Sequence, residues 1–87
     1  MELNQLLNKL SSIGRANGKK IVFSRELTVK SDFAELIIKS NENEIAKVSF
    51  TSFDSTKVVE NLEYACVNLI LNLMLSNSYL AFGAEND

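Results

Sequence analysis

Few side chains in this sequence are able to carry out acid–base or nucleophilic chemistry. The chain contains no histidine and a single cysteine, Cys66. Ser-His-Asp and Cys-His sites are therefore excluded, and proton transfer near neutral pH would fall to carboxylates, lysine or tyrosine. The acidic pairs Glu42/Glu44 and Glu60/Glu63 lie in segments typical of solvated surface. We therefore expect a protein that is not an enzyme.

The same residue counts argue against a bound metal or cofactor. One cysteine without histidine supplies too few ligands for a structural zinc site and forms no internal disulfide. The glycines at positions 14, 18 and 83 are isolated, so no glycine-rich phosphate loop is present. Cys66 lies within an apolar run, where a free thiol usually behaves as a small buried hydrophobe. These features suit a reducing cytoplasm, and we expect neither metal nor cofactor.

Hydrophobic periodicity predicts a helix at each end of the chain. Leucines at helical spacing define the first, over residues 2–15, and Asn17-Gly18 is suited to end it. The second begins near Asp54, which we expect to cap it, and lasts to about Ser76, with a resumption over residues 79–82.

Three segments with alternating apolar residues lie between the helices. They predict strands over residues 20–30, 33–40 and 45–51, the last two joined by a polar hairpin at residues 41–44. The expected fold is α+β, in the order α-β-β-β-α: a three-stranded antiparallel sheet flanked by two helices, both most simply on one face. The chain forms one domain over residues 1–87, with 83–87 as a frayed tail.

The run Tyr64–Leu75 is more apolar than one helix face requires. It holds 12 residues and is interrupted by Asn68 and Asn72, whereas a membrane span needs about 20 apolar residues. The first residues show no pattern of a secretory signal, so we expect a cytoplasmic protein without a membrane segment.

The surplus apolar surface of this run favours an interface with another protein. The simplest solution is a homodimer through the C-terminal helix. In the alternative, the first helix and residues 79–82 cover the surplus within the chain. The predicted contact residues are Val67, Leu71, Met74, Leu75 and Tyr79, with Glu35, Glu42 and Glu44 as a charged rim.

Charge is distributed unevenly and leaves nucleic-acid binding as an alternative. The net charge is −2, but residues 1–30 carry six basic and two acidic side chains. The element order resembles that of double-stranded RNA-binding domains, although the lysine-rich helix start of that family is replaced by one lysine, Lys57, after Asp54. Phosphate contacts would then come from Lys9, Arg15, Lys19 and Lys20.

Three segments resemble parts of small anti-CRISPR proteins carried by phages and prophages. They are Leu6–Leu10, Ala34–Glu44 and Asp54–Leu62, within a resemblance that covers roughly residues 3–65. The resemblance implies inhibition of a host defence nuclease complex by occlusion of its nucleic-acid-binding surface with acidic side chains. This chain is less acidic, and its last helix is more apolar, than such a mimic needs. We therefore expect a phage or mobile-element accessory protein that inhibits a host protein complex by occupying its surface.

Overall fold

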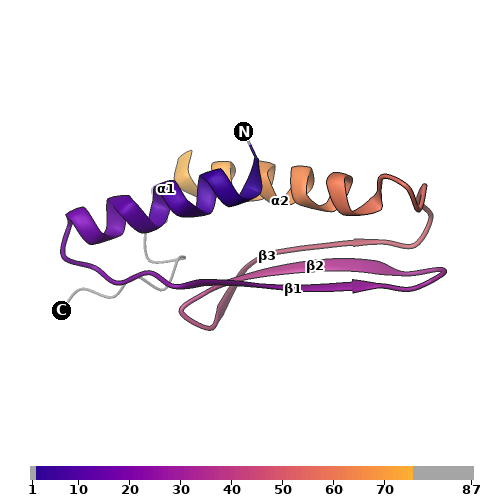
Figure 1. The fold of residues 1–87 in the computed structure, drawn as a ribbon, viewed down its shortest axis with the longest axis horizontal. Helices are drawn as coiled ribbons and strands as arrows, with labels where there is room; N and C mark the ends of the chain where they lie inside the picture. Colours follow the sequence, from indigo (N-terminus) through magenta and orange to yellow (C-terminus); the bar gives the residue numbers. More distant parts are fainter. Residues whose placement is uncertain (1, 76–87) are drawn as a thin grey trace.

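Two helices cover one face of a three-stranded antiparallel sheet (Figure 1). The computed structural model describes residues 2–75. The elements are α1 (Leu3–Ala16), β1 (Phe23–Val29), β2 (Ala34–Ser40), β3 (Asn43–Phe50) and α2 (Val58–Leu75). The strands lie in the order β1-β2-β3, so β2 is central and the other two are edges. The predicted α+β fold is confirmed, including the placement of both helices on the same face.

Local capping determines where α1 begins and ends. Glu2 and Gln5 form a capping box, in which the Glu2 amide donates to Gln5 Oε1 at 3.2 Å. At the other end, Gly18 adopts a positive φ of 73°, and the Lys19 amide donates to the Gly14 carbonyl at 2.8 Å. A residue without a Cβ adopts this backbone conformation at little cost. The predicted stop at Asn17-Gly18 is confirmed.

The β2–β3 connection is a two-residue turn at Asn41 and Glu42, both with positive φ (48° and 72°). Two such residues match the right-handed twist of the strands they join. Strand β3 therefore begins at Asn43, two residues before the predicted start, and a register shift lies between Ile38 and Lys39.

The predicted start of α2 at Asp54 is wrong. Asp54 Oδ1 accepts hydrogen bonds from both the backbone amide and the hydroxyl of Thr56, at 2.9 and 2.7 Å. This local turn competes with helix capping, and the helix begins only at Val58. The hydroxyl of Thr56 is also the main reason that the pKa of Asp54 is lowered. The predicted helical resumption at residues 79–82 and the frayed tail at 83–87 lie outside the described residues.

The core lies between the helices and the inner face of the sheet. Cross-strand pairing places alternate residues of the three strands on that face. They are Phe23, Leu27 and Val29 on β1, Ala34, Leu36 and Ile38 on β2, and Ala46, Val48 and Phe50 on β3. The largest fully buried apolar side chains come from α1, β2 and α2: Leu6, Leu36, Ile38, Val58, Leu62 and Ile70.

Candidate functional site

The inner face of β1 is much less covered than that of its neighbour. Leu27 and Val29 are 44% and 49% exposed, whereas the residues paired with them on β2, Leu36 and Ala34, are 0% exposed. The reason is that α2 packs over β2 and β3. Strand β1 therefore carries apolar side chains toward the helix layer without a helix above its second half.

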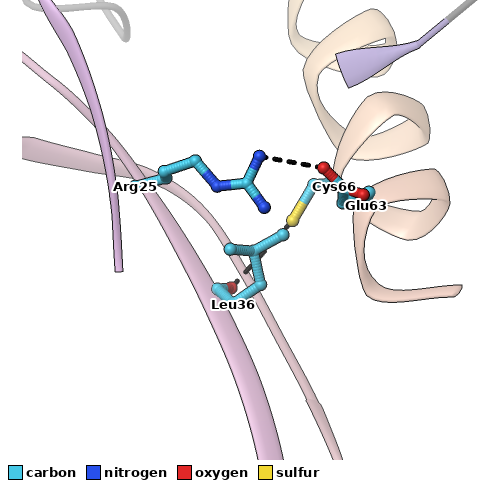
Figure 2. A network of polar contacts seen from close by, with 4 residues as sticks. All are labelled: Arg25, Leu36, Glu63 and Cys66. Carbon is cyan, nitrogen blue, oxygen red and sulfur yellow. Dashed lines mark hydrogen bonds and ion pairs between the residues drawn. The ribbon is translucent and has the colours of Figure 1, made fainter. Parts of the chain in front are cut away.

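Arg25 marks the boundary between the covered and open parts of β1. It shares a face with Leu27, and its Nη1 donates to Glu63 Oε2 on α2 at 2.9 Å (Figure 2). About a third of each side chain is exposed, and pairs of this kind contribute roughly 0.2–1 kcal/mol. The inner-face position of Arg25, an exception to the apolar pattern of the sequence, is thus explained by a contact across the layers.

Val59 extends this open region onto α2. Figure 1 shows α2 running in the opposite direction to β1. Residues of α2 that precede Glu63 therefore lie toward the end of β1. Val59, one helical turn before Glu63, is 37% exposed. We call Leu27, Val29 and Val59 the open flank.

A groove lies beside the first half of β1, under α1. Its volume is about 620 Å³, and its walls are α1 and residues 20–25. Leu7, Ile21 and Phe23 supply apolar surface, and the polar lining includes three cations, Arg15, Lys20 and Arg25. Among the described residues that line it, none carries a carboxylate.

Close packing of the chain after α1 forms the end wall of this groove. Ile21 lies on Gly14 so closely that a Cβ added there would be 2.8 Å from Ile21 Cδ1. The Ser11 hydroxyl donates to the Ile21 carbonyl at 3.4 Å. Glycine weakens the last turn of α1 on propensity alone. It is nevertheless required at position 14, because any larger side chain there would collide with Ile21 where the chain passes back across the helix.

Asn41 fixes the same segment from the other side. Its Oδ1 accepts from the Val22 amide at 2.9 Å, and its Nδ2 donates to the Lys20 carbonyl at 3.1 Å. Its own backbone amide donates to the Val22 carbonyl at 2.9 Å. The Asn41 side chain of the β2–β3 turn therefore positions residues 20–22, which lead into β1 and line the groove.

The residues predicted for an interface on the C-terminal helix have different environments. Val67 is buried within the chain, near the start of α1, and Met74 is half-buried against the core. Leu71 is 37% exposed and Leu69, which was not predicted, is 40% exposed. Val67 is thus covered within the chain, as in the alternative to an interface with another protein. The side chain of Leu75, and all of Tyr79, lie outside the described residues.

The predicted charged rim is not assembled around α2. Glu35 lies on the outer face of the sheet, away from the helices, where it contacts Lys47 at 3.8 Å and accepts from the Ser49 hydroxyl at 2.9 Å. Glu42 and Glu44 lie in the exposed β2–β3 hairpin. None of the three borders the exposed leucines of α2 as a ring of charge would.

The predicted phosphate contacts are only partly brought together. Arg15 and Lys20 line the groove, and Arg25, which was not predicted, joins them. Lys9 is exposed on α1 and Lys19 is half-buried, and neither lines the groove. Sequence reasoning missed Arg25 because its partner Glu63 is 38 positions away.

Cys66 lies on the side of α2 that faces the sheet. Its side chain is buried, and its Sγ lies 4.0 Å from the Leu36 carbonyl oxygen (Figure 2). Burial raises the pKa of the thiol to about 11, with smaller contributions of opposite sign from Arg25 and Glu63. A thiol of this kind is a poor nucleophile at neutral pH. In residues 2–75, no three Cys, Asp or Glu side chains are grouped as metal ligands would be.

Neither of the two helices of the described region has the length and apolar character needed to cross a membrane. Comparison of the chain with protein-family models, with curated proteins and with solved structures gave no match. The anti-CRISPR resemblance therefore stays a prediction. The class that the structure itself defines is a small α+β domain with an incompletely covered edge strand.

Proposed function

We propose that this chain is a non-catalytic protein-binding protein that acts by occupying the surface of a partner protein, with the open flank as its contact surface. One observation carries the proposal: Leu27 and Val29 are about half exposed, although they face the same side as fully buried residues of β2. Apolar side chains grouped in this way typically mark interaction surfaces.

The matched pair Val29→Lys and Thr28→Lys tests this proposal. Val29 belongs to the open flank, whereas Thr28 points to the outer face of the sheet. Both variants add the same charge to exposed, adjacent positions. The partner is captured from cells that contain the protein, and its affinity for each purified variant is measured by calorimetry.

We expect Val29→Lys to weaken binding at least about tenfold, because an apolar contact of the open flank is lost and the ammonium that replaces it must give up water on burial. We expect Thr28→Lys to change it less than about twofold. Equal affinities for the two variants would show that the open flank is not the contact surface.

Within this class, we propose a phage or mobile-element accessory protein of the cytoplasm that inhibits a host protein complex, as anti-CRISPR proteins do. The helix, three-stranded meander and helix order supports it. The test is target cleavage by a host defence nuclease complex with increasing amounts of the protein. Full cleavage at saturating protein would refute inhibition of that complex.

A homodimer through α2 is supported by the exposure of Leu69 and Leu71. Light scattering of the native chain, Leu71→Asp and the control Asn72→Asp tests it. A dimer that dissociates only in Leu71→Asp is the expected result, and a monomeric native chain would contradict it.

Nucleic-acid binding remains the second candidate, supported by Arg15 and Lys20 at the groove. It predicts micromolar binding of duplex RNA or DNA that weakens steeply between low and physiological salt. Such binding, together with an unaffected Val29→Lys variant, would favour this candidate over protein binding.

A further inference from the structure

We propose that the free edge of β1 and the adjoining groove bind an extended, acidic segment of the partner protein, which adds to the sheet as a strand beside β1. This inference rests on the proposed protein-binding function and specifies the chemistry of the partner. It requires a strand edge with free backbone groups, space beside that edge, and a charge that favours an acidic occupant.

The hydrogen-bond pattern of β1 shows which backbone groups its free edge presents. The Lys30 amide donates to the Phe33 carbonyl, and the Asn41 amide donates to the Val22 carbonyl. In an antiparallel ladder, alternate residues direct both backbone groups to the same neighbour. The even-numbered residues 22–30 therefore face β2. The amides and carbonyls of Phe23, Arg25, Leu27 and Val29 point away from it, to the side on which no strand of residues 2–75 pairs with β1.

This edge has few of the features that usually prevent strand addition. Natural edges are protected by proline, bulges, inward charges or a covering helix. Strand β1 has seven residues, none of them proline, and an unbroken register with β2. Its inward charge, Arg25, is engaged by Glu63. At the other edge of the sheet, β3 lies under α2 and its pairing with β2 contains a register shift. Strand β1 is therefore the edge suited to pairing.

The groove determines the chemistry of the added strand. On the inner side of the edge, apolar side chains of Leu7, Ile21 and Phe23 lie beside Arg15, Lys20 and Arg25, and none of the lining residues within 2–75 is a carboxylate. Arg25 is already paired with Glu63, so Arg15 and Lys20 supply the unbalanced positive charge. An extended peptide projects alternate side chains to opposite faces, so only every second residue of the added strand enters the groove. A segment that carries both acidic and apolar residues at these inward positions matches the two kinds of lining.

The charge disfavours the two other occupants. A second copy pairing through its own β1 would bring Arg25 and Lys30, against one Glu26, to a groove that is already cationic. A nucleic-acid strand would use Arg15 and Lys20 but would leave the apolar wall and the backbone groups of the edge without partners.

The test uses fluorescein-labelled octapeptides in which every second residue is in turn Glu and Val (the Glu-Val peptide), or Lys and Val (the Lys-Val peptide), with threonine at the positions between. Affinity is measured by fluorescence anisotropy on the full chain. The key pair of variants is Leu27→Pro and Leu27→Ala. Both remove the leucine side chain, but only proline removes the outward amide, and it does so without removing a hydrogen bond to β2. Circular dichroism checks that each variant is folded.

We expect the Glu-Val peptide to bind and the Lys-Val peptide to bind at least about tenfold more weakly. We expect Leu27→Pro to weaken Glu-Val binding about tenfold relative to Leu27→Ala, since loss of the outward donor interrupts the added ladder. The double variant Arg15→Glu/Lys20→Glu should abolish the preference for the acidic peptide.

Several results would overturn the inference. They are no binding of the Glu-Val peptide, equal affinities for Leu27→Pro and Leu27→Ala, or a preference for the Lys-Val peptide. A dimer of the native chain that only Leu27→Pro dissociates would assign the edge to a second copy. Duplex RNA binding that depends on Arg15 and Lys20 but not on the Leu27 amide would assign the groove to nucleic acid. If these peptides fail while Val29→Lys still impairs partner capture, protein binding stands and only the acidic-strand inference falls.

Discussion

Replacement of Asn41 by alanine is expected to destabilise the protein far more than its position in a surface turn suggests. Two side-chain hydrogen bonds are lost, at 2.9 and 3.1 Å, to the Val22 amide and the Lys20 carbonyl. Both bonds are exposed, so each contributes about 0.5 kcal/mol, at the low end of the usual range. Alanine at a φ of 48° costs about 1 kcal/mol more. The expected loss in the free energy of unfolding is therefore about 2 kcal/mol.

The matched control is Asn41→Gly, which loses the same two hydrogen bonds but tolerates the positive φ. We expect it to lose about 1 kcal/mol. Urea denaturation gives both values, and a loss of 2 kcal/mol in a domain of this size lowers Tm by about 8–16 °C. A loss below about 0.5 kcal/mol for Asn41→Ala would refute the account of the hydrogen bonds. Equal losses for the two variants would refute the account of the backbone.

Three further predictions concern the turn, the buried thiol and the sheet edge. Glu42→Gly should raise the free energy of unfolding by about 0.5–1 kcal/mol in urea denaturation, because Glu42 has a φ of 72°; a loss of stability would contradict this. The pKa of Cys66 is raised in the folded protein to about 11, so the unfolded state releases its proton at lower pH. Stability should therefore fall as the pH rises from about 9 toward 11, and less so in Cys66→Val; an equal fall in both would exclude the thiol as the cause. Amide hydrogen exchange should be slow at Ser24, Glu26 and Thr28 and fast at Arg25 and Leu27; uniform protection along β1 would mean that its outer edge is already paired.

Much of the fold was predictable because its signals are local. Leucines at helical spacing place α1, alternation places the strands and their inner faces, and Asn17-Gly18 and Asn41 mark positions where a positive φ is tolerated. The start of α2 was not predictable in the same way. Asp54 satisfies the pattern of a helix cap, but its side chain is used by Thr56 in a turn that precedes the helix.

The candidate surface was less accessible to prediction than the fold. Apolar composition pointed to the C-terminal helix, yet Val67 is buried inside the chain while the half-exposed Leu27 and Val29 lie on β1. Composition measures how much apolar surface a segment has, and packing decides which part of it is covered.

The sequence by itself determined the order of elements, the inner faces of the strands, and the small number of groups that could support catalysis, because each depends on residue type and short spacing. Only the tertiary structure decided where the two helices lie over the sheet. It placed α2 over β2 and β3, joined Arg25 to Glu63 across 38 positions, and left the edge of β1 open beside a cationic groove. Two helices on three strands cannot cover every strand equally, and which strand remains open follows from long-range packing that no local pattern records.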